Sequence, residues 1–157
     1  MSELRDLYQE VILDHAKNPR NFGPGAADDR KVVGHNPLCG DKLVLAVRVE
    51  DGTVTDAHFQ GEGCAISKAS ASLMTESLKG KSVKEAEALY EGFHELVTGE
   101  PLDAASGAKL ENAQEQLGKL AVFAGVAEYP ARVKCASLAW HVLHAALAGD
   151  SDTVTTE

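Results

Sequence analysis

Residues 61–67 read Gly61-Glu62-Gly63-Cys64-Ala65-Ile66-Ser67 and join a predicted β-strand to a predicted helix. The two glycines, one residue apart, allow a sharp turn or a close approach of the backbone to another group. Cys64 is therefore expected near a helix N-terminus, where unpaired N–H groups and the helix dipole favour a thiolate. Because thiolates bind metal ions and attack sulfur, this stretch is a candidate for either kind of chemistry.

A predicted hairpin precedes this stretch. Residues 43–50 and 53–60 read as its two strands, and Asp51-Gly52 between them is the typical signal of a type I′ turn. The face of the first strand that is expected to be buried carries Leu43, Leu45, Val47 and Val49. Residues 31–35 are predicted to add a short edge strand. Together these segments indicate a small antiparallel sheet with one buried face.

The rest of the chain is predicted to be mainly helical. Apolar periodicity and end signals indicate helices at residues 3–17, 64–79, 83–97 and 110–124, and a last one that begins between 130 and 134 and ends at 148. A capping box, Ser82-Val83-Lys84-Glu85, opens the third of them. The predicted class is α+β, a small antiparallel three-stranded sheet packed by about five helices. Residues 1–149 are expected to form one domain, and the acidic tail 150–157 to be disordered.

Composition narrows the classes of function. The chain of 157 residues has a net charge of −9 and no long basic run, which argues against nucleic acid as a partner. No apolar segment is long enough to cross a bilayer and no signal-peptide pattern is present, so we expect a cytoplasmic protein without membrane contact. Three cysteines in a reducing compartment argue against a disulfide framework. Metal binding, thiol chemistry or three buried small side chains remain.

The three cysteines have related settings. Cys39 lies on a predicted turn after Asn36-Pro37 and is followed by Gly40-Asp41, while Cys135 lies in an early turn of the last helix. Arg132 and Lys134 flank Cys135 and would favour its thiolate. Two helix starts and one strand-entry loop can converge at one end of a sheet, where three thiolates and Asp41 would supply the four ligands that zinc prefers. Spacing alone leaves a shared site and three separate cysteines both open, since no Cys-x-x-Cys pair occurs.

Several motifs in a fixed order add a resemblance that spans residues 4–148. The sequence resembles the SufU-type proteins of the IscU/NifU-like superfamily, which serve iron–sulfur cluster biogenesis and share a compact α+β fold. The residues that carry the resemblance are Leu7-Tyr8, Val11-Ile12-Leu13-Asp14-His15, Asn18-Pro19-Arg20-Asn21, Asn36-Pro37-Leu38-Cys39-Gly40-Asp41, Phe59-Gln60-Gly61-Glu62-Gly63-Cys64-Ala65-Ile66-Ser67, Ala69-Ser70-Ala71-Ser72 and Tyr129-Pro130-Ala131-Arg132-Val133-Lys134-Cys135-Ala136.

The resemblance implies a zinc-dependent sulfurtransferase. Its zinc ligands would be Cys39, Asp41, Cys64 and Cys135, and its partner a SufS-type cysteine desulfurase, which is a pyridoxal-phosphate enzyme. In the family's scheme the partner supplies a replacement zinc ligand, which frees Cys39 to accept the desulfurase's persulfide sulfur. A SufB/C/D-type scaffold would then receive the sulfur. Cys39 suits the acceptor role because Pro37 and Gly40 bound a loop that can move more easily than a helix start.

Two alternatives remain beside this interpretation. An IscU-type scaffold would assemble a transient iron–sulfur cluster on the cysteines. Such scaffolds usually carry histidine before the third cysteine, where this chain has Lys134, and a Leu-Pro-Pro-Val-Lys motif where it has Glu128-Tyr129-Pro130-Ala131-Arg132. A non-catalytic module with structural zinc is the other alternative, since closed four-ligand zinc sites are usually structural. Arg132 and Lys134 would either offset the charge of the anionic ligands or be ordinary solvated cations.

Overall fold

The computed structural model describes residues 2–25, 29–36, 40–98, 120, 123, 130–148 and 153–155. The elements in chain order are α1 (Ser2–Lys17), β1 (Arg30–Asn36), β2 (Asp41–Glu50), β3 (Thr53–Glu62), α2 (Ala65–Leu78), α3 (Val83–Thr98), α5 (Pro130–Ala148) and β4 (Thr153–Thr155). The predicted α+β class is confirmed. The helix expected at 110–124 lies outside the described residues except for Leu120 and Phe123, which are both buried.

The sheet has the strand order β3-β2-β1-β4. β2 pairs antiparallel with both β1 and β3, which confirms the predicted three-stranded antiparallel core of the sheet. At the hairpin turn, Asp51 and Gly52 have φ angles of 53° and 75°. Positive φ at both central residues is what a type I′ turn requires, so this prediction is confirmed as well.

The tail departs from the expectation. Residues 150–157 were expected to be disordered, but Thr153–Thr155 form β4 and pair parallel with Val33–His35 of β1. The segment is short and lies in an acidic tail, although its three β-branched residues favour an extended conformation. An unpaired edge of β1 offers backbone hydrogen bonds to any extended segment within reach, which accounts for the pairing.

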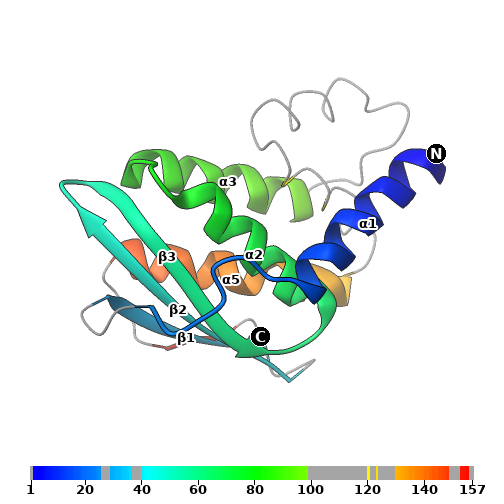
Figure 1. Ribbon diagram of the computed structural model, residues 1–157, viewed down its shortest axis with the longest axis horizontal. Coiled ribbons are helices and arrows are strands. Elements are labelled where there is room, and N and C mark those ends of the chain that lie inside the picture. Colours follow the sequence, from blue (N-terminus) through cyan, green and yellow to red (C-terminus); the bar gives the residue numbers. More distant parts are fainter. Residues whose placement is uncertain are drawn as a thin grey trace.

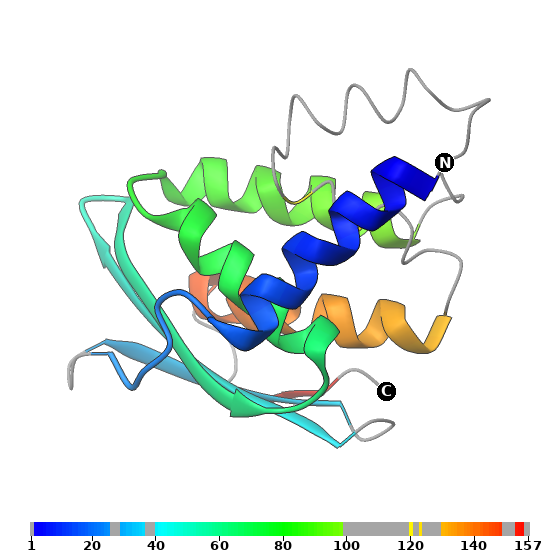
Figure 2. The ribbon, with the colours of Figure 1, turned by 45° about the vertical axis from the view of Figure 1, so that its right-hand side comes forward.

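The described helices cover one face of the sheet (Figures 1 and 2). α5 packs against β1 and β2 and against the helices α2 and α3, and it approaches β1 closely at Gly34, where a Cβ atom would collide with the side chain of Val142. The indole N–H of Trp140 donates to Ser70 Oγ at 3.1 Å, and Ser70 Oγ donates to the carbonyl of Ala136 at 2.6 Å. These contacts fix α5 against α2, the two helices that carry cysteines near their starts.

None of the described helices combines the length and apolar character that crossing a membrane requires.

Where α3 contacts α5, three histidines surround Tyr90. The Tyr90 hydroxyl lies 3.2 Å from His141 Nδ1, and the rings of His94 and His144 both stack with the Tyr90 ring, with centroids 6.0 and 4.7 Å away. Glu87 contacts His144 Nδ1 at 3.0 Å. Burial, and then the nearby His94 and His144, lower the pKa of His141 below its ordinary 6.5.

His141 is therefore expected to make stability depend on pH. Because its pKa is lower in the folded state, the unfolded chain binds a proton first as the pH falls below about 6.5. The melting temperature should fall through this window, and less so in His141→Gln, which keeps a polar group beside Tyr90. Thermal unfolding of both proteins from pH 7.5 to 5.5, with His35→Gln as an exposed-histidine control, measures the difference. Parallel curves for the parent and His141→Gln would contradict the expectation.

Candidate metal centre

Asp41 begins β2 at the end of the hairpin formed with β1. It pairs with Asn36 in the antiparallel register, and the Gly40 N–H donates to the Asn36 carbonyl at 2.9 Å to close the connection. Gly40 has a φ of 75°, a left-handed conformation that glycine adopts without strain. The Asp41 side chain is buried, with 1% of its surface exposed. Burial of a carboxylate is costly unless charges or hydrogen bonds compensate it, so its partners are informative.

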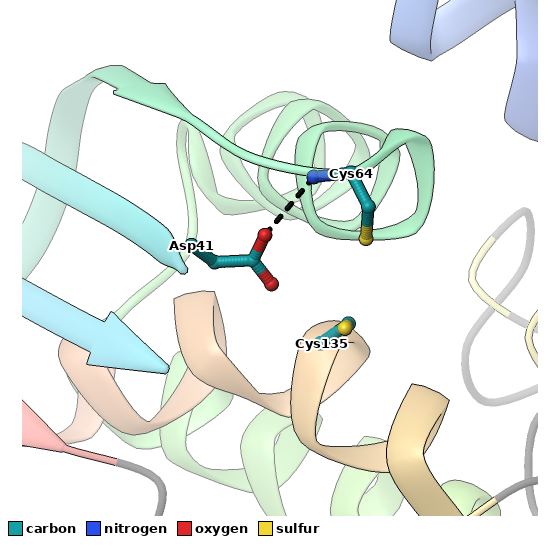
Figure 3. A group of neighbouring side chains, drawn as sticks. All are labelled: Asp41, Cys64 and Cys135. Atoms are coloured by element: carbon teal, nitrogen blue, oxygen red, sulfur yellow. Dashed lines mark hydrogen bonds between the residues drawn. The ribbon is translucent and has the colours of Figure 1, made fainter. Parts of the chain in front are cut away.

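Cys64 is the N-cap residue of α2, as its position after the two glycines predicted. Its carbonyl accepts the first hydrogen bond of the helix, from Lys68 N at 3.2 Å, and its own N–H donates to Asp41 Oδ1 at 3.0 Å. Figure 3 shows this bond and the Cys64 side chain turned towards Cys135. The residue is exposed, whereas Cys135 on α5 is buried. Asp41 therefore binds the start of α2 directly.

One donor atom from each of Asp41, Cys64 and Cys135 lies within 4.8 Å of the other two. The three residues come from β2, from the start of α2 and from α5, so the fold brings together segments that are far apart in the sequence (Figure 3). A carboxylate and two thiolates suit zinc, whose bonds of about 2.0–2.3 Å to such ligands need only a modest contraction of this cluster. Among the described residues, no lysine or arginine forms an ion pair with Asp41. A cation at the cluster would compensate the buried carboxylate.

The other predicted site residues are Cys39, Arg132 and Lys134. Cys39 lies outside the described residues, and its part in the site stays a prediction. Arg132 is exposed and Lys134 is partly buried, both in the first turns of α5. Within the described part of the chain, Lys134 makes no hydrogen bond or ion pair with Asp41 or Cys64. Charge compensation by Arg132 and Lys134 likewise stays a prediction.

Sequence reasoning missed one residue at the centre. Asn36, read only as a strand break before Pro37, has a fully buried side chain. Its Nδ2 lies 3.4 Å from Asp41 Oδ2 and 3.6 Å from Cys135 Sγ. The sequence contained one signal for Asn36, namely its position opposite Asp41 across the predicted loop. Its contact with Cys135 could not be predicted, because that contact depends on how α5 packs.

The model of the NifU-like N-terminal domain matches residues 7–136, which include all four predicted ligands. The chain belongs to this family.

Relatives within the NifU-like family carry two different descriptions. The zinc-dependent sulfurtransferase SufU of Bacillus subtilis (strain 168) is 40% identical, over 94% of this chain and 93% of its own length. The iron–sulfur cluster assembly scaffold protein IscU of Streptococcus pyogenes serotype M1 is 41% identical, over 94% and 86%. Identity alone therefore does not choose between sulfurtransferase and scaffold.

A solved structure agrees with the fold. FiSufU of Fervidobacterium islandicum AW-1, described as an iron–sulfur cluster assembly scaffold protein for the SUF system, superposes with a TM-score of 0.72 and 31% identity. The match covers 88% of this chain and 94% of FiSufU.

Gly63 leaves room for the Asp41 side chain in this NifU-like domain. A Cβ atom at residue 63 would collide with Asp41 Oδ1 and lie 2.9 Å from Asp41 Cγ. Gly63→Ala should displace the carboxylate from the Cys64 N–H and lower zinc affinity about tenfold or more, the scale of lost support for a ligand. Competition with a chromophoric chelator measures this. Gly80→Ala, at a left-handed glycine with nothing within 4 Å of its Cβ position, should reduce stability but leave zinc affinity unchanged. Equal affinity in Gly63→Ala and the parent would refute the role of Gly63.

Proposed function

We propose that this protein is a zinc-dependent sulfur acceptor in iron–sulfur cluster biogenesis, with Asp41, Cys64, Cys135 and Cys39 as the zinc ligands. The observation that carries the proposal is the cluster of Asp41, Cys64 and Cys135 donor atoms within 4.8 Å of one another. Bound zinc would hold the cysteine sulfurs as thiolates and protect them from oxidation. The 40% identity to the zinc-dependent sulfurtransferase SufU supports zinc as the metal.

The proposed role of each ligand follows from how firmly the fold holds it. Cys64 and Cys135 belong to helices that packing holds in place, so they suit fixed ligands. Asp41 is held by the Cys64 N–H and by Asn36. Two peptide units separate Cys39 from Asp41, so the covalent chain limits their Cα separation to about 7 Å. Cys39 can thus belong to the same centre.

Cys39 is the proposed sulfur acceptor. Its thiolate would attack the terminal sulfur of a persulfide on a SufS-type cysteine desulfurase. A new S–S bond forms on Cys39, the S–S bond on the desulfurase breaks, and the desulfurase cysteine leaves as a thiolate, with no net oxidation or reduction. Passing the same sulfur to a SufB/C/D-type scaffold would restore the Cys39 thiolate.

Lys134 favours the sulfur acceptor over a scaffold. Resemblance to scaffold proteins predicts histidine before the third cysteine, a further ligand for a cluster. Here that position holds Lys134, which has no acceptor atom and, when protonated, cannot bind iron. The identity of 41% to a scaffold IscU keeps cluster assembly as the competing outcome of the test.

The test is turnover of a cysteine desulfurase, measured as alanine formed from cysteine, with and without this protein, before and after zinc removal. We expect the zinc-loaded protein to raise turnover and the metal-free protein to do so much less. A stable cluster after anaerobic reconstitution, with no response of the desulfurase, would replace the proposal by the scaffold function. Bound zinc with neither result would leave a structural zinc module.

A further inference from the structure

Asn36 interrupts the apolar pattern on the inner face of the sheet. The buried positions of β1 alternate through Val32, Gly34 and Asn36, and α5 packs against this strand. Strand alternation predicts an apolar side chain at the third position, yet Asn36 is 0% exposed. A fully buried polar residue where the pattern requires an apolar one indicates a role beyond folding.

The Asn36 side chain contacts two of the three clustered donor groups. Its Nδ2 donates towards Asp41 Oδ2 at 3.4 Å and towards Cys135 Sγ at 3.6 Å. One amide nitrogen carries two hydrogens, so one group can serve both partners. The hairpin itself is closed by the Asn36 backbone carbonyl, which accepts from the Gly40 N–H at 2.9 Å. Closure of the hairpin therefore does not depend on the side chain.

The orientation of the Asn36 carboxamide also supports a role beside the proposed zinc ligands. Asn36 Oδ1 is buried and has no hydrogen-bond partner among the described residues, which costs free energy. Rotating the group by half a turn would place Oδ1 against a carboxylate and a sulfur, both electron-rich. The contacts of Nδ2 with Asp41 and Cys135 therefore favour the orientation that leaves Oδ1 without a partner among the described residues.

We propose that Asn36 is a positioning residue of the metal centre. Its Nδ2 holds the side chains of Asp41 and Cys135 in place from β1 and offsets part of their negative charge. The inference rests on the proposed function only in taking Asp41 and Cys135 as zinc ligands. Hydrogen bonds from surrounding residues orient metal ligands in this way, and their loss typically lowers metal affinity about 10–100-fold.

The test replaces Asn36 by leucine, which has a similar size and no donor. Zinc affinity, measured by competition with a chromophoric chelator, should fall about 10–100-fold. The melting temperature in excess chelator should fall only slightly, because the loss of the donor to Asp41 Oδ2 is partly balanced by removal of the buried, unpaired Asn36 carbonyl oxygen. After cobalt replaces zinc, the thiolate-to-cobalt absorption band should move to longer wavelength, because the Cys135 sulfur has lost an N–H donor.

Two further variants make the result decisive. Val32→Ala disturbs the same buried face of β1, so it should lower the melting temperature while zinc affinity and the cobalt band stay unchanged. Asn36→Val repeats the test with a smaller side chain suited to a strand. Zinc affinity within about twofold of the parent, with an unmoved cobalt band, would overturn the proposal. The proposal would also be overturned if both Asn36 variants failed to fold while Val32→Ala folded, because Asn36 would then be required for folding. None of these measurements uses a desulfurase, so they test the role of Asn36 independently of sulfur acceptance.

Discussion

Removal of zinc is expected to lower the melting temperature of the protein by roughly 5–16 °C. Structural zinc contributes about 10–16 kcal/mol of apparent binding free energy, part of which is folding free energy. If a quarter of it stabilises the fold, and 1 kcal/mol corresponds to about 2–4 °C for a chain of this size, the shift is of that order. The Asp41, Cys64 and Cys135 donors come from β2, the start of α2 and α5, so a bound ion would tie these three elements together.

The measurement pairs metal analysis with thermal unfolding. Protein purified without added metal should contain about one zinc per chain, and a strong chelator should shift its melting curve. A double variant, Cys64→Ser with Cys135→Ser, is the matched control, since the chelator should not change its melting temperature. Zinc below roughly a tenth of an equivalent per chain would contradict the metal centre.

Local signals allowed much of the fold to be predicted. The capping box opens α3 as expected, with the Glu85 N–H bonded to Ser82 Oγ and the Ser82 N–H bonded to Glu85 Oε1, both at 3.0 Å. The Asp51-Gly52 turn was equally predictable, because only its two residues need positive φ. Signals of this kind lie within a few residues of the element that they define.

Non-local effects account for what the sequence did not reveal. Val49 was assigned to the buried face of β2 but is 43% exposed, whereas Val54 on β3 is fully buried. The pairing register shifts between Arg48 and Val49, where Thr55 of β3 has no partner, and this extra residue reverses the alternation of β3 and places Val54 on the buried face. Val49 lies one residue before the end of β2, beside the exposed turn. In the same way, Asn36 meets Cys135 only because α5 returns to β1, 99 residues later in the chain.

Replacement of single cysteines should separate metal binding from sulfur acceptance. Cys64→Ser and Cys135→Ser each remove a thiolate from an anchored helix. Zinc affinity should therefore fall more than about 100-fold, beyond the usual effect of losing a residue that only supports a ligand. Stability should fall with it. Cys135→Ala accompanies Cys135→Ser because Cys135 is 3% exposed, and alanine avoids burying a hydroxyl. Loss of zinc in both variants would assign the effect to the missing ligand.

Cys39→Ser is expected to behave differently. Asp41, Cys64 and Cys135 remain as three donors, the number of protein ligands that many zinc sites have, so much of the zinc should stay bound. Sulfur acceptance should be lost almost completely, because a serine hydroxyl does not form a persulfide. Mass spectrometry after reaction with desulfurase and cysteine locates the added sulfur. If it lies on Cys64 or Cys135, and Cys39→Ser still accepts sulfur, then the acceptor is a helix-anchored cysteine and Cys39 has another role.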